Sequence, residues 1–165
     1  MNSELFNAWL PGWQPDETLY SWCARYHRIA GGVRASQTSL RLFGHPRAGL
    51  AHDLGGRLTH LVEQTGGALG SVSDLLLTHT LLGYYMVFRP LAERELWTSR
   101  LAAGTQGAIK TQLGWLATRM GAAHPLKGCV ACEAEDVAQG FSPYWRREHQ
   151  APGVWVCIRH QCTLG

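Results

Sequence analysis

Four residues near the C-terminus constrain the fold of this 165-residue chain more than any other feature. Cys129 and Cys132 form a C-x2-C pair, and a segment of 24 residues separates them from Cys157 and His160, which form a C-x2-H pair. A two-residue spacer lets both members of a pair face one ion, and three thiolates with one imidazole suit tetrahedral zinc. Because four protein ligands leave no open coordination position, the pattern predicts one structural Zn²⁺.

Other uses of these cysteines agree less well with the surrounding sequence. A redox C-x-x-C normally begins a helix within a βαβ unit, and no such pattern surrounds Cys129. The chain has five cysteines, an odd number, and no secretion signal, which indicates a reducing cytosol and argues against disulfides. One alternative stays open, in which Cys162 replaces His160 as the fourth ligand. Cys23 lies among apolar residues and is expected to be a small buried side chain.

The chain changes character near Gly121. Helical periodicity dominates before this point, whereas cysteines, histidines, prolines and aromatic residues cluster after it. The last 45 residues contain few aliphatic side chains. Metal binding would therefore have to supply their folding free energy, about 10 kcal/mol in small zinc domains. We expect a mostly α protein, with a helical, helix-turn-helix-like domain over residues 1–120 and a small zinc-ribbon-like, zinc-binding module over residues 121–165.

Apolar residues at helical spacing predict a series of helices in the first domain. They cover about residues 19–30, 36–44, 50–64, 71–88, 92–104 and 106–121. The segment 71–88 is apolar almost all round, which predicts a buried central helix that Pro90 interrupts. The first two helices are short and are joined by a glycine-containing turn, as in a helix-turn-helix unit.

The first two helices also have candidate caps and faces. Asp16 and Ser36 are of the residue types that cap helix N-termini. In the first helix Ser21 is expected on the polar face. In the second helix Leu40 and Phe43 are expected to face inward.

Positive charge is concentrated around these two helices. Between Thr18 and His60 there are six arginines and one acid, Asp53, whereas the net charge of the whole chain is only +3. A local basic patch of this kind suits a polyanion, and a nucleic acid is the expected one. The candidate DNA-contacting residues are Arg25, Arg28, Arg34, Arg41 and Arg47. The alternative is a solvated arginine-rich face that binds no partner.

Little in the sequence supports catalysis or membrane insertion. We find no nucleophile–base pair at diagnostic spacing, no glycine loop that would hold a phosphate and no paired carboxylates. No stretch of 18 or more apolar residues could span a membrane, and the first residues lack the features of a signal peptide. We therefore expect a cytoplasmic protein without enzymatic activity. His27 is expected to have a surface role and His79 a buried, hydrogen-bonded role.

Several stretches together resemble the TniQ family of transposition proteins, which includes target selectors of the TnsD type. They are PDETLYSWCARYHRIAG near the N-terminus, LLLTHTLLGYYMVF in the middle, and GCVACEAED with GFSPYWRREHQAPGVWVCIRH near the C-terminus. The family pattern has L-x-S-W-x-x-R in the first helix, then C-x-x-C, Y-W-R-x-x-H-Q, P-G-V and C-x-x-H. All of these occur here in order, over nearly the whole chain, and HQAPGVWVCIRH is the most specific.

The resemblance implies that the protein helps to choose the insertion site of a transposon. TniQ-like proteins work with an AAA+ ATPase of the TnsC or TniB type, which recruits the transposase. Members of the TnsD type bind a specific site on double-stranded DNA. In CRISPR-associated transposons a TniQ protein joins the RNA-guided effector complex, sometimes as a dimer. The implied partners are therefore the ATPase, DNA, a CRISPR effector complex and a second copy of the chain, in the bacterial cytoplasm.

The resemblance also implies roles for individual residues. The family's zinc ligands fall on Cys129, Cys132, Cys157 and His160. The residues that match the intervening motif are expected to pack around the zinc and to shape a contact surface; they are Tyr144, Trp145, His149, Gln150, Pro152 and Gly153. For His149 a contact with the phosphate backbone is the alternative.

Two questions stay open at the level of sequence. Many family members continue well past the C-x-x-H, whereas this chain stops five residues after His160. It is either a short member or the N-terminal part of a longer protein, in which case Cys162 would belong to a second zinc site. The protein is also either an adaptor or a stand-alone, sequence-specific DNA-binding regulator with a structural zinc. A regulator gains affinity from base-edge contacts, whereas an adaptor that binds phosphates loses affinity steeply with salt.

Overall fold

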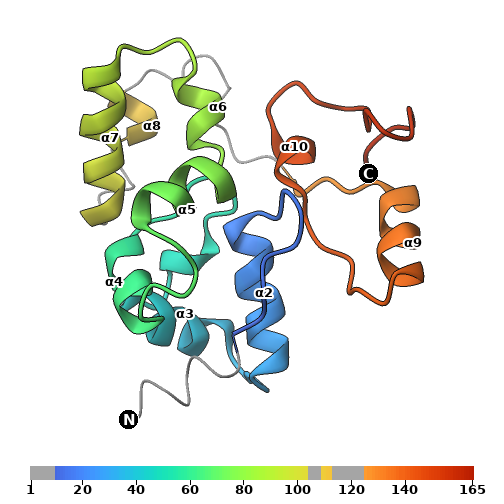
Figure 1. Ribbon diagram of the computed structural model, residues 1–165, viewed down its shortest axis with the longest axis horizontal. Coiled ribbons are helices and arrows are strands. Elements are labelled where there is room, and N and C mark those ends of the chain that lie inside the picture. Colours follow the sequence, from blue (N-terminus) through green and yellow to red (C-terminus); the bar gives the residue numbers. More distant parts are fainter. Residues whose placement is uncertain (1–9, 104–108, 113–124) are drawn as a thin grey trace.

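The computed structural model describes residues 10–103, 109–112 and 125–165, and these residues are mostly helical, which confirms the predicted fold class (Figure 1). In the first part of the chain the helices are α2 (Leu19–Ile29), α3 (Ala35–Phe43), the 3₁₀ helix η1 (Ala48–Leu50), α4 (Leu58–Gln64), α5 (Val72–His79), α6 (Leu82–Met86), α7 (Leu91–Ala103) and α8 (Ile109–Gln112). The C-terminal part contains α9 (Val130–Ala138) and α10 (Arg147–Gln150). The described residues form only isolated β-bridges and no strands.

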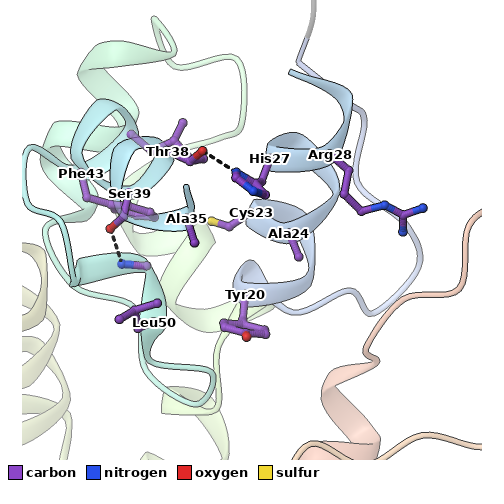
Figure 2. A pocket seen from close by; sticks show the side chains of 12 residues that line it. Tyr20, Cys23, Ala24, His27, Arg28, Ala35, Thr38, Ser39, Phe43 and Leu50 are labelled. Atoms are coloured by element: carbon purple, nitrogen blue, oxygen red, sulfur yellow. Dashed lines mark hydrogen bonds between the residues drawn. The ribbon is translucent and has the colours of Figure 1, made fainter. Parts of the chain in front are cut away.

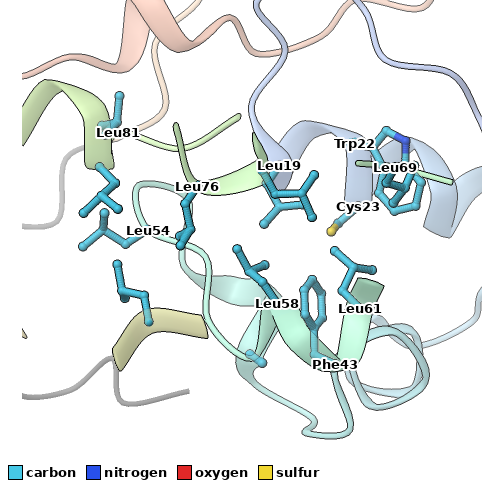
Figure 3. Close-up of a cluster of buried hydrophobic side chains, with 14 of the residues drawn as sticks. Leu19, Trp22, Cys23, Phe43, Leu54, Leu58, Leu61, Leu69, Leu76 and Leu81 are labelled. Atoms are coloured by element: carbon cyan, nitrogen blue, oxygen red, sulfur yellow. The ribbon is translucent and has the colours of Figure 1, made fainter. Parts of the chain in front are cut away.

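The helices α2 to α7 enclose one apolar core. Leucines from α2, α4 and α5 lie in one buried cluster with Phe43 from α3, whose ring is close to Leu58 and Leu61 of α4 (Figure 3). Trp22 is fully buried, stacks on Tyr26 with ring centroids 5.5 Å apart, and donates from its indole nitrogen to the carbonyl oxygen of Pro11. Cys23 also lies in this core, where burial raises the pKa of its thiol, so its predicted role as a small buried side chain is confirmed.

The caps and faces of the first two helices differ from the prediction in several respects. Thr18, and not Asp16, caps α2 by accepting from the backbone N–H of Ser21. Ser21 is itself buried and does not lie on an exposed polar face. Ser36 lies inside α3, which begins without a side-chain cap. Leu40 is 53% exposed, whereas Phe43 faces inward as predicted.

Two long predicted helices are interrupted. Over residues 50–64, η1 ends at Leu50 and α4 begins only at Leu58, because Arg57 adopts a left-handed backbone conformation with φ 57°. Over residues 71–88, Thr80 is extended and separates α5 from α6. The hydroxyl of Thr80 lies 2.6 Å from the carbonyl oxygen of Leu76 and accepts from the N–H of Leu82, so it replaces regular helical bonding at the break.

The remaining predictions for the helical domain have mixed outcomes. The helix predicted over residues 92–104 is confirmed as α7. Of the helix predicted over 106–121, the structure describes only α8. The predicted boundary near Gly121 also lies outside the described residues. No helix in the described ranges combines the length and the apolar character needed to cross a membrane.

The C-terminal part docks on the beginning of α2 through what we call the α2–α10 interface, in which residues 16–21 contact residues 145–148. The N–H of Thr18 donates to the carbonyl oxygen of Trp145, and the N–H of Trp145 donates to the hydroxyl of Ser21. The carboxylate of Asp16 accepts from the side chain of Arg147 and from the N–H of Glu148. Asp16 therefore joins α2 to α10 instead of capping α2.

Candidate metal centre

The four residues predicted to bind zinc come together in the structure. The sulfur atoms of Cys129, Cys132 and Cys157 and a ring nitrogen of His160 all lie within 4.8 Å of one another. The three cysteines are buried and form the centre of a small cluster with Ala131, Cys162 and Leu164 around it. Side chains from two segments that are far apart in the sequence thus point to one small volume.

The first pair is positioned by the beginning of α9. Cys129 is the N-cap residue, and its sulfur accepts from the N–H of Cys132 at 3.5 Å. Burial raises the pKa of Cys129, but this N–H and the neighbouring thiols outweigh burial and lower its pKa to about 7. The positive end of the helix dipole also favours a thiolate at this position.

The second pair is positioned by a tight turn between Val156 and Thr163, which form an isolated antiparallel bridge. Gln161 takes a left-handed conformation with φ 52°, and its N–H donates to the carbonyl oxygen of Cys157. This closes the turn and directs Cys157 and His160 to the same side.

Four of the six donor–donor separations in the cluster are close to those around a tetrahedral zinc ion. With Zn–S bonds of about 2.3 Å and Zn–N bonds of about 2.0–2.1 Å, a tetrahedron needs S···S edges of about 3.8 Å and S···N edges of about 3.6 Å. The sulfur atoms of Cys132 and Cys157 are 3.8 Å apart. Nδ1 of His160 lies 3.4 Å, 3.3 Å and 3.6 Å from the sulfur atoms of Cys129, Cys132 and Cys157, respectively. This cluster of three cysteines and one histidine is therefore compatible with one structural zinc.

The histidine of the cluster is oriented by a carboxylate outside it. Nε2 of His160 is 2.9 Å from Glu135, whose other oxygen accepts from Arg159 at 2.8 Å. This hydrogen bond raises the pKa of His160 and lowers that of Glu135. A carboxylate that holds one ring nitrogen fixes the ring, so that the other nitrogen can face a metal. Here Nδ1 is the nitrogen that faces the sulfur atoms.

The sequence did not reveal how the first cysteine pair is held. We expected two similar turns, but Cys129 and Cys132 begin a helix, as a redox C-x-x-C would. The difference from a redox pair lies in the two further donors from the turn at Cys157, which converge on the same volume. In the described residues no βαβ unit surrounds the pair.

The residues of the intervening motif lie between the cluster and the helical domain. Trp145 packs against Tyr20 with ring centroids 5.6 Å apart, and the amide of Gln150 exchanges two hydrogen bonds with the backbone of Lys127. The carbonyl oxygen of Pro152 accepts from the hydroxyl of Tyr84 in α6. These residues therefore make their contacts with α2, α6 and the segment before α9.

The other three motif residues are Tyr144, His149 and Gly153. Tyr144 is buried with its ring 4.2 Å from the guanidinium carbon of Arg146. Gly153 has φ 83°, a conformation that favours glycine. His149 is 2% exposed, and burial lowers its pKa. Nε2 of His149 has no hydrogen-bond partner within the described part of the chain. Because this side chain is buried, the structure does not present it to a phosphate.

A buried ion pair connects the metal centre to the α2–α10 interface. Arg146 binds Asp136 of α9 through two hydrogen bonds of 3.0 Å and 2.6 Å, and both side chains are nearly fully buried. Arg146 also forms a backbone bridge with Glu17. Sequence reasoning missed these contacts. The signal that could have found the ion pair is the run of acids in CEAED and the pair of arginines in YWRRE, which are of opposite charge.

The arginines that we predicted to contact DNA have two different environments. Arg25 donates to both carboxylate oxygens of the fully buried Glu17, at 2.8 Å and 2.7 Å, and to the carbonyl oxygen of Gly12. It is engaged in packing the start of α2, and we do not include it in the set proposed to contact DNA. The other predicted residues are exposed; they are Arg28, Arg34, Arg41 and Arg47.

A largely apolar pocket of about 250 Å³ lies between α2, α3 and η1 in this basic region (Figure 2). His27 is not simply a surface residue, because its Nδ1 lies 2.6 Å from the hydroxyl of Thr38 across the pocket. Arg28 lines the pocket but extends away from it. His79 in α5 stacks on Trp13 and its Nδ1 lies 2.8 Å from the carbonyl oxygen of Glu17, which confirms its predicted hydrogen-bonded role, but the side chain is only half-buried.

A helical part followed by a cluster of three cysteines and one histidine is the arrangement expected of proteins that hold one metal ion with four protein ligands. The chain belongs to the TniQ family, whose pattern matches residues 8–164. It is similar to the transposon Tn7 transposition protein TnsD of Escherichia coli, with 28% identity over 149 residues. This similarity covers 88% of the chain and 29% of the relative, so the chain spans less than a third of the length of TnsD.

Proposed function

We propose that the protein acts in target-site selection during DNA transposition. In this proposal it is an adaptor that links target DNA, or a complex bound to the target, to an AAA+ ATPase of the TnsC or TniB type, which then recruits the transposase. The observation that carries the proposal is the family match, because residues 8–164 include both the helical domain and the whole metal centre. The similarity to a transposition protein supports the same role.

The proposal includes one structural Zn²⁺, bound by Cys129, Cys132, Cys157 and His160. The convergence of the four donors and the tetrahedral separations support it. A site closed by four protein ligands has no position for water or substrate, so the protein is proposed not to be an enzyme. We also propose that residues 1–120 and 121–165 are two functional units. The first would contact DNA, and the second would position partners.

The proposed DNA-contacting surface is the exposed face of α2, α3 and η1. Arg28, Arg34, Arg41 and Arg47 are exposed there. The sequence contains no aspartate or glutamate between Thr18 and His52, and the charge of the preceding Glu17 is paired with Arg25. A surface with this charge attracts the DNA backbone, and its phosphate contacts would not depend on sequence.

A second candidate function is a stand-alone, sequence-specific DNA-binding regulator. The specific observation in its favour is that Arg28 and Arg41 lie on two short helices with Arg34 in the turn between them, the arrangement from which a helix-turn-helix protein reads bases. The two functions differ in whether the ATPase must be present for tight binding to DNA.

A CRISPR effector complex and a second copy of the chain are further proposed partners, and the bacterial cytoplasm is the proposed location.

The first experiment measures association of the purified, zinc-loaded chain with an ATP-bound AAA+ partner assembled on random-sequence DNA, with bare DNA as the control. For an adaptor we expect strong capture only when the ATPase is present. Equal binding to bare DNA, with no gain from the ATPase, would contradict the adaptor and favour the regulator.

The second experiment tests the DNA surface with charge-matched variants. Replacing Arg28 and Arg34 by glutamine should reduce the magnitude of the slope of log affinity against log salt concentration by about 2, since each lost phosphate contact reduces that magnitude by about 1. The matched control replaces Arg89, just before α7, and Arg94, in its first turns, by glutamine and should leave the slope unchanged. Equal slopes for both variants would place the DNA contacts elsewhere.

A further inference from the structure

The fifth cysteine of the chain, Cys162, is held on the same face as the metal ligand Cys157. Val156 and Thr163 form an antiparallel bridge, so the next pair inward along the turn is Cys157 with Cys162. The N–H of Cys157 donates to the carbonyl oxygen of Cys162 at 2.9 Å, which keeps the two residues in register. Side chains of directly opposed residues point to the same side of an antiparallel pair. The backbone therefore aims Cys162 at the metal centre.

The position of its sulfur agrees with this backbone placement. The sulfur atom of Cys162 is 3.4 Å from that of Cys129 and packs against the buried cysteine cluster. Cys162 is nevertheless not one of the four residues whose donor atoms all lie within 4.8 Å of one another. It is a fourth thiol next to a complete set of four donors.

The other four donors are not held equally firmly. Cys129, Cys132 and Cys157 are at most 1% exposed, whereas the side chain of His160 is 21% exposed. His160 is thus the donor that the fold can release most easily.

We propose that Cys162 is a reserve metal ligand, which takes the fourth position when His160 leaves and gives the ion four cysteine ligands in place of three cysteines and one histidine. In this exchange the nitrogen–metal bond of His160 breaks, the thiol of Cys162 loses its proton to solvent, and a sulfur–metal bond forms. The other three ligands keep their places. The exchange suits divalent ions that favour thiolates, such as Zn²⁺, Co²⁺ and Cd²⁺. This inference rests on the metal site proposed above and extends its donor set.

The test uses the full chain and three variants, His160→Ala, Cys162→Ser and the double variant. Zinc affinity is measured by competition with a chromophoric chelator, and the donor set by the intensity of thiolate-to-Co²⁺ charge-transfer absorption. We expect His160→Ala to bind one ion with four thiolates, and Cys162→Ser to bind one ion with three. The double variant should bind at least about 100-fold more weakly than His160→Ala, since even outer residues of a metal site contribute up to that much.

Two results would overturn the reserve ligand. One is that His160→Ala binds zinc as weakly as the double variant. The other is that it binds well but its Co²⁺ absorption stays that of three thiolates, because water would then be the fourth ligand. If the unaltered chain binds no zinc, the proposed metal site fails as well. If the unaltered chain and Cys162→Ser both bind zinc while His160→Ala does not, the metal site stands and only the reserve ligand fails.

A measurement on the unaltered chain keeps the test valid if His160→Ala does not fold. Loading the unaltered chain and Cys162→Ser with ¹¹³Cd²⁺ allows the ¹¹³Cd chemical shift to report the number of sulfur ligands. Because Cd²⁺ favours thiolates over imidazole, we expect the unaltered chain to show a four-sulfur shift and Cys162→Ser a three-sulfur shift. Identical shifts for the two proteins would contradict the proposal.

Discussion

The helical domain and the C-terminal part of the chain are stabilised in different ways. In the helical domain, fully buried residues such as Trp22, Leu58 and Leu75 form one continuous apolar core. In the C-terminal part, the buried centre is three cysteines, and the residues around it are held by ion pairs and amide hydrogen bonds. Apolar burial is non-directional and tolerates small changes, whereas ligands and buried charges require their partners. The two parts should therefore fail for different reasons.

The largest effect is expected from breaking the metal site. Cys129→Ser removes one ligand and the N-cap of α9. Since zinc binding contributes about 10 kcal/mol to folding in small zinc domains, residues 125–165 should lose their structure. Hydrogen exchange followed by mass spectrometry should show lost protection in α9 and retained protection in α4 and α5.

The matched control for this variant is Cys23→Ser, a cysteine that lies in the apolar core and outside the metal cluster. It should keep a full equivalent of zinc. If Cys129→Ser retained zinc and protection in α9, the contrast between the two parts would be wrong.

The second effect concerns the buried ion pair within the C-terminal part. Asp136→Asn leaves the buried guanidinium of Arg146 without its charged partner. Breaking a buried pair by removing one member costs about 3–5 kcal/mol, so the free energy of unfolding in urea should fall by that amount. The control is Glu93→Gln in the exposed pair with Arg89, for which the change should be below about 1 kcal/mol. Equal changes would show that burial of the pair does not matter.

A third prediction tests the apolar core within one helix. Leu76 is fully buried in α5, whereas its neighbour Leu77 is 49% exposed. Leu76→Ala should lower the free energy of unfolding by about 2–5 kcal/mol, since it removes buried methyl groups and leaves a cavity. Leu77→Ala should have a much smaller effect. Zinc content should be unchanged in both variants, and loss of zinc from Leu76→Ala would mean that the two parts unfold together.

The smallest predicted effect is at the start of the same helix. Ser71 and Asp74 form a capping box, in which each side chain accepts from the backbone of the other. Ser71→Ala should lower the free energy of unfolding by about 1 kcal/mol. Ser73→Ala, in the first turn but outside the capping box, serves as the control. A thermal melt resolves the difference, and no shift relative to the control would contradict the role of the cap.

The metal centre was predictable from the sequence because its constraint is local. Cys129 with Cys132 and Cys157 with His160 have spacings that leave few arrangements other than one shared ion. The mostly helical class was predictable for a related reason, since apolar periodicity in segments such as 92–104 depends on few distant contacts. The buried state of Cys23 follows from the same periodicity.

Other features were not predictable because they depend on contacts between distant segments. Thr80 breaks the central helix although its surroundings are apolar, because its hydroxyl bonds the backbone at the break. Asp16 looks like a cap in the sequence, but its carboxylate is taken by Arg147 and Glu148, more than a hundred residues away. Arg25 looks like a surface charge until Glu17 is seen to be buried beside it. Helical periodicity in the sequence predicts none of these contacts.

The α2–α10 interface has a consequence for building hybrid proteins from members of this family. Residues 16–21 and 145–148 contribute the two halves of the interface through Asp16, Ser21, Trp145 and Arg147. A hybrid with a single crossover anywhere between these segments takes the two halves from different parents. Such a crossover preserves every local motif and still mismatches the interface. Hybrids should therefore exchange both segments together, as though they were one continuous stretch of sequence.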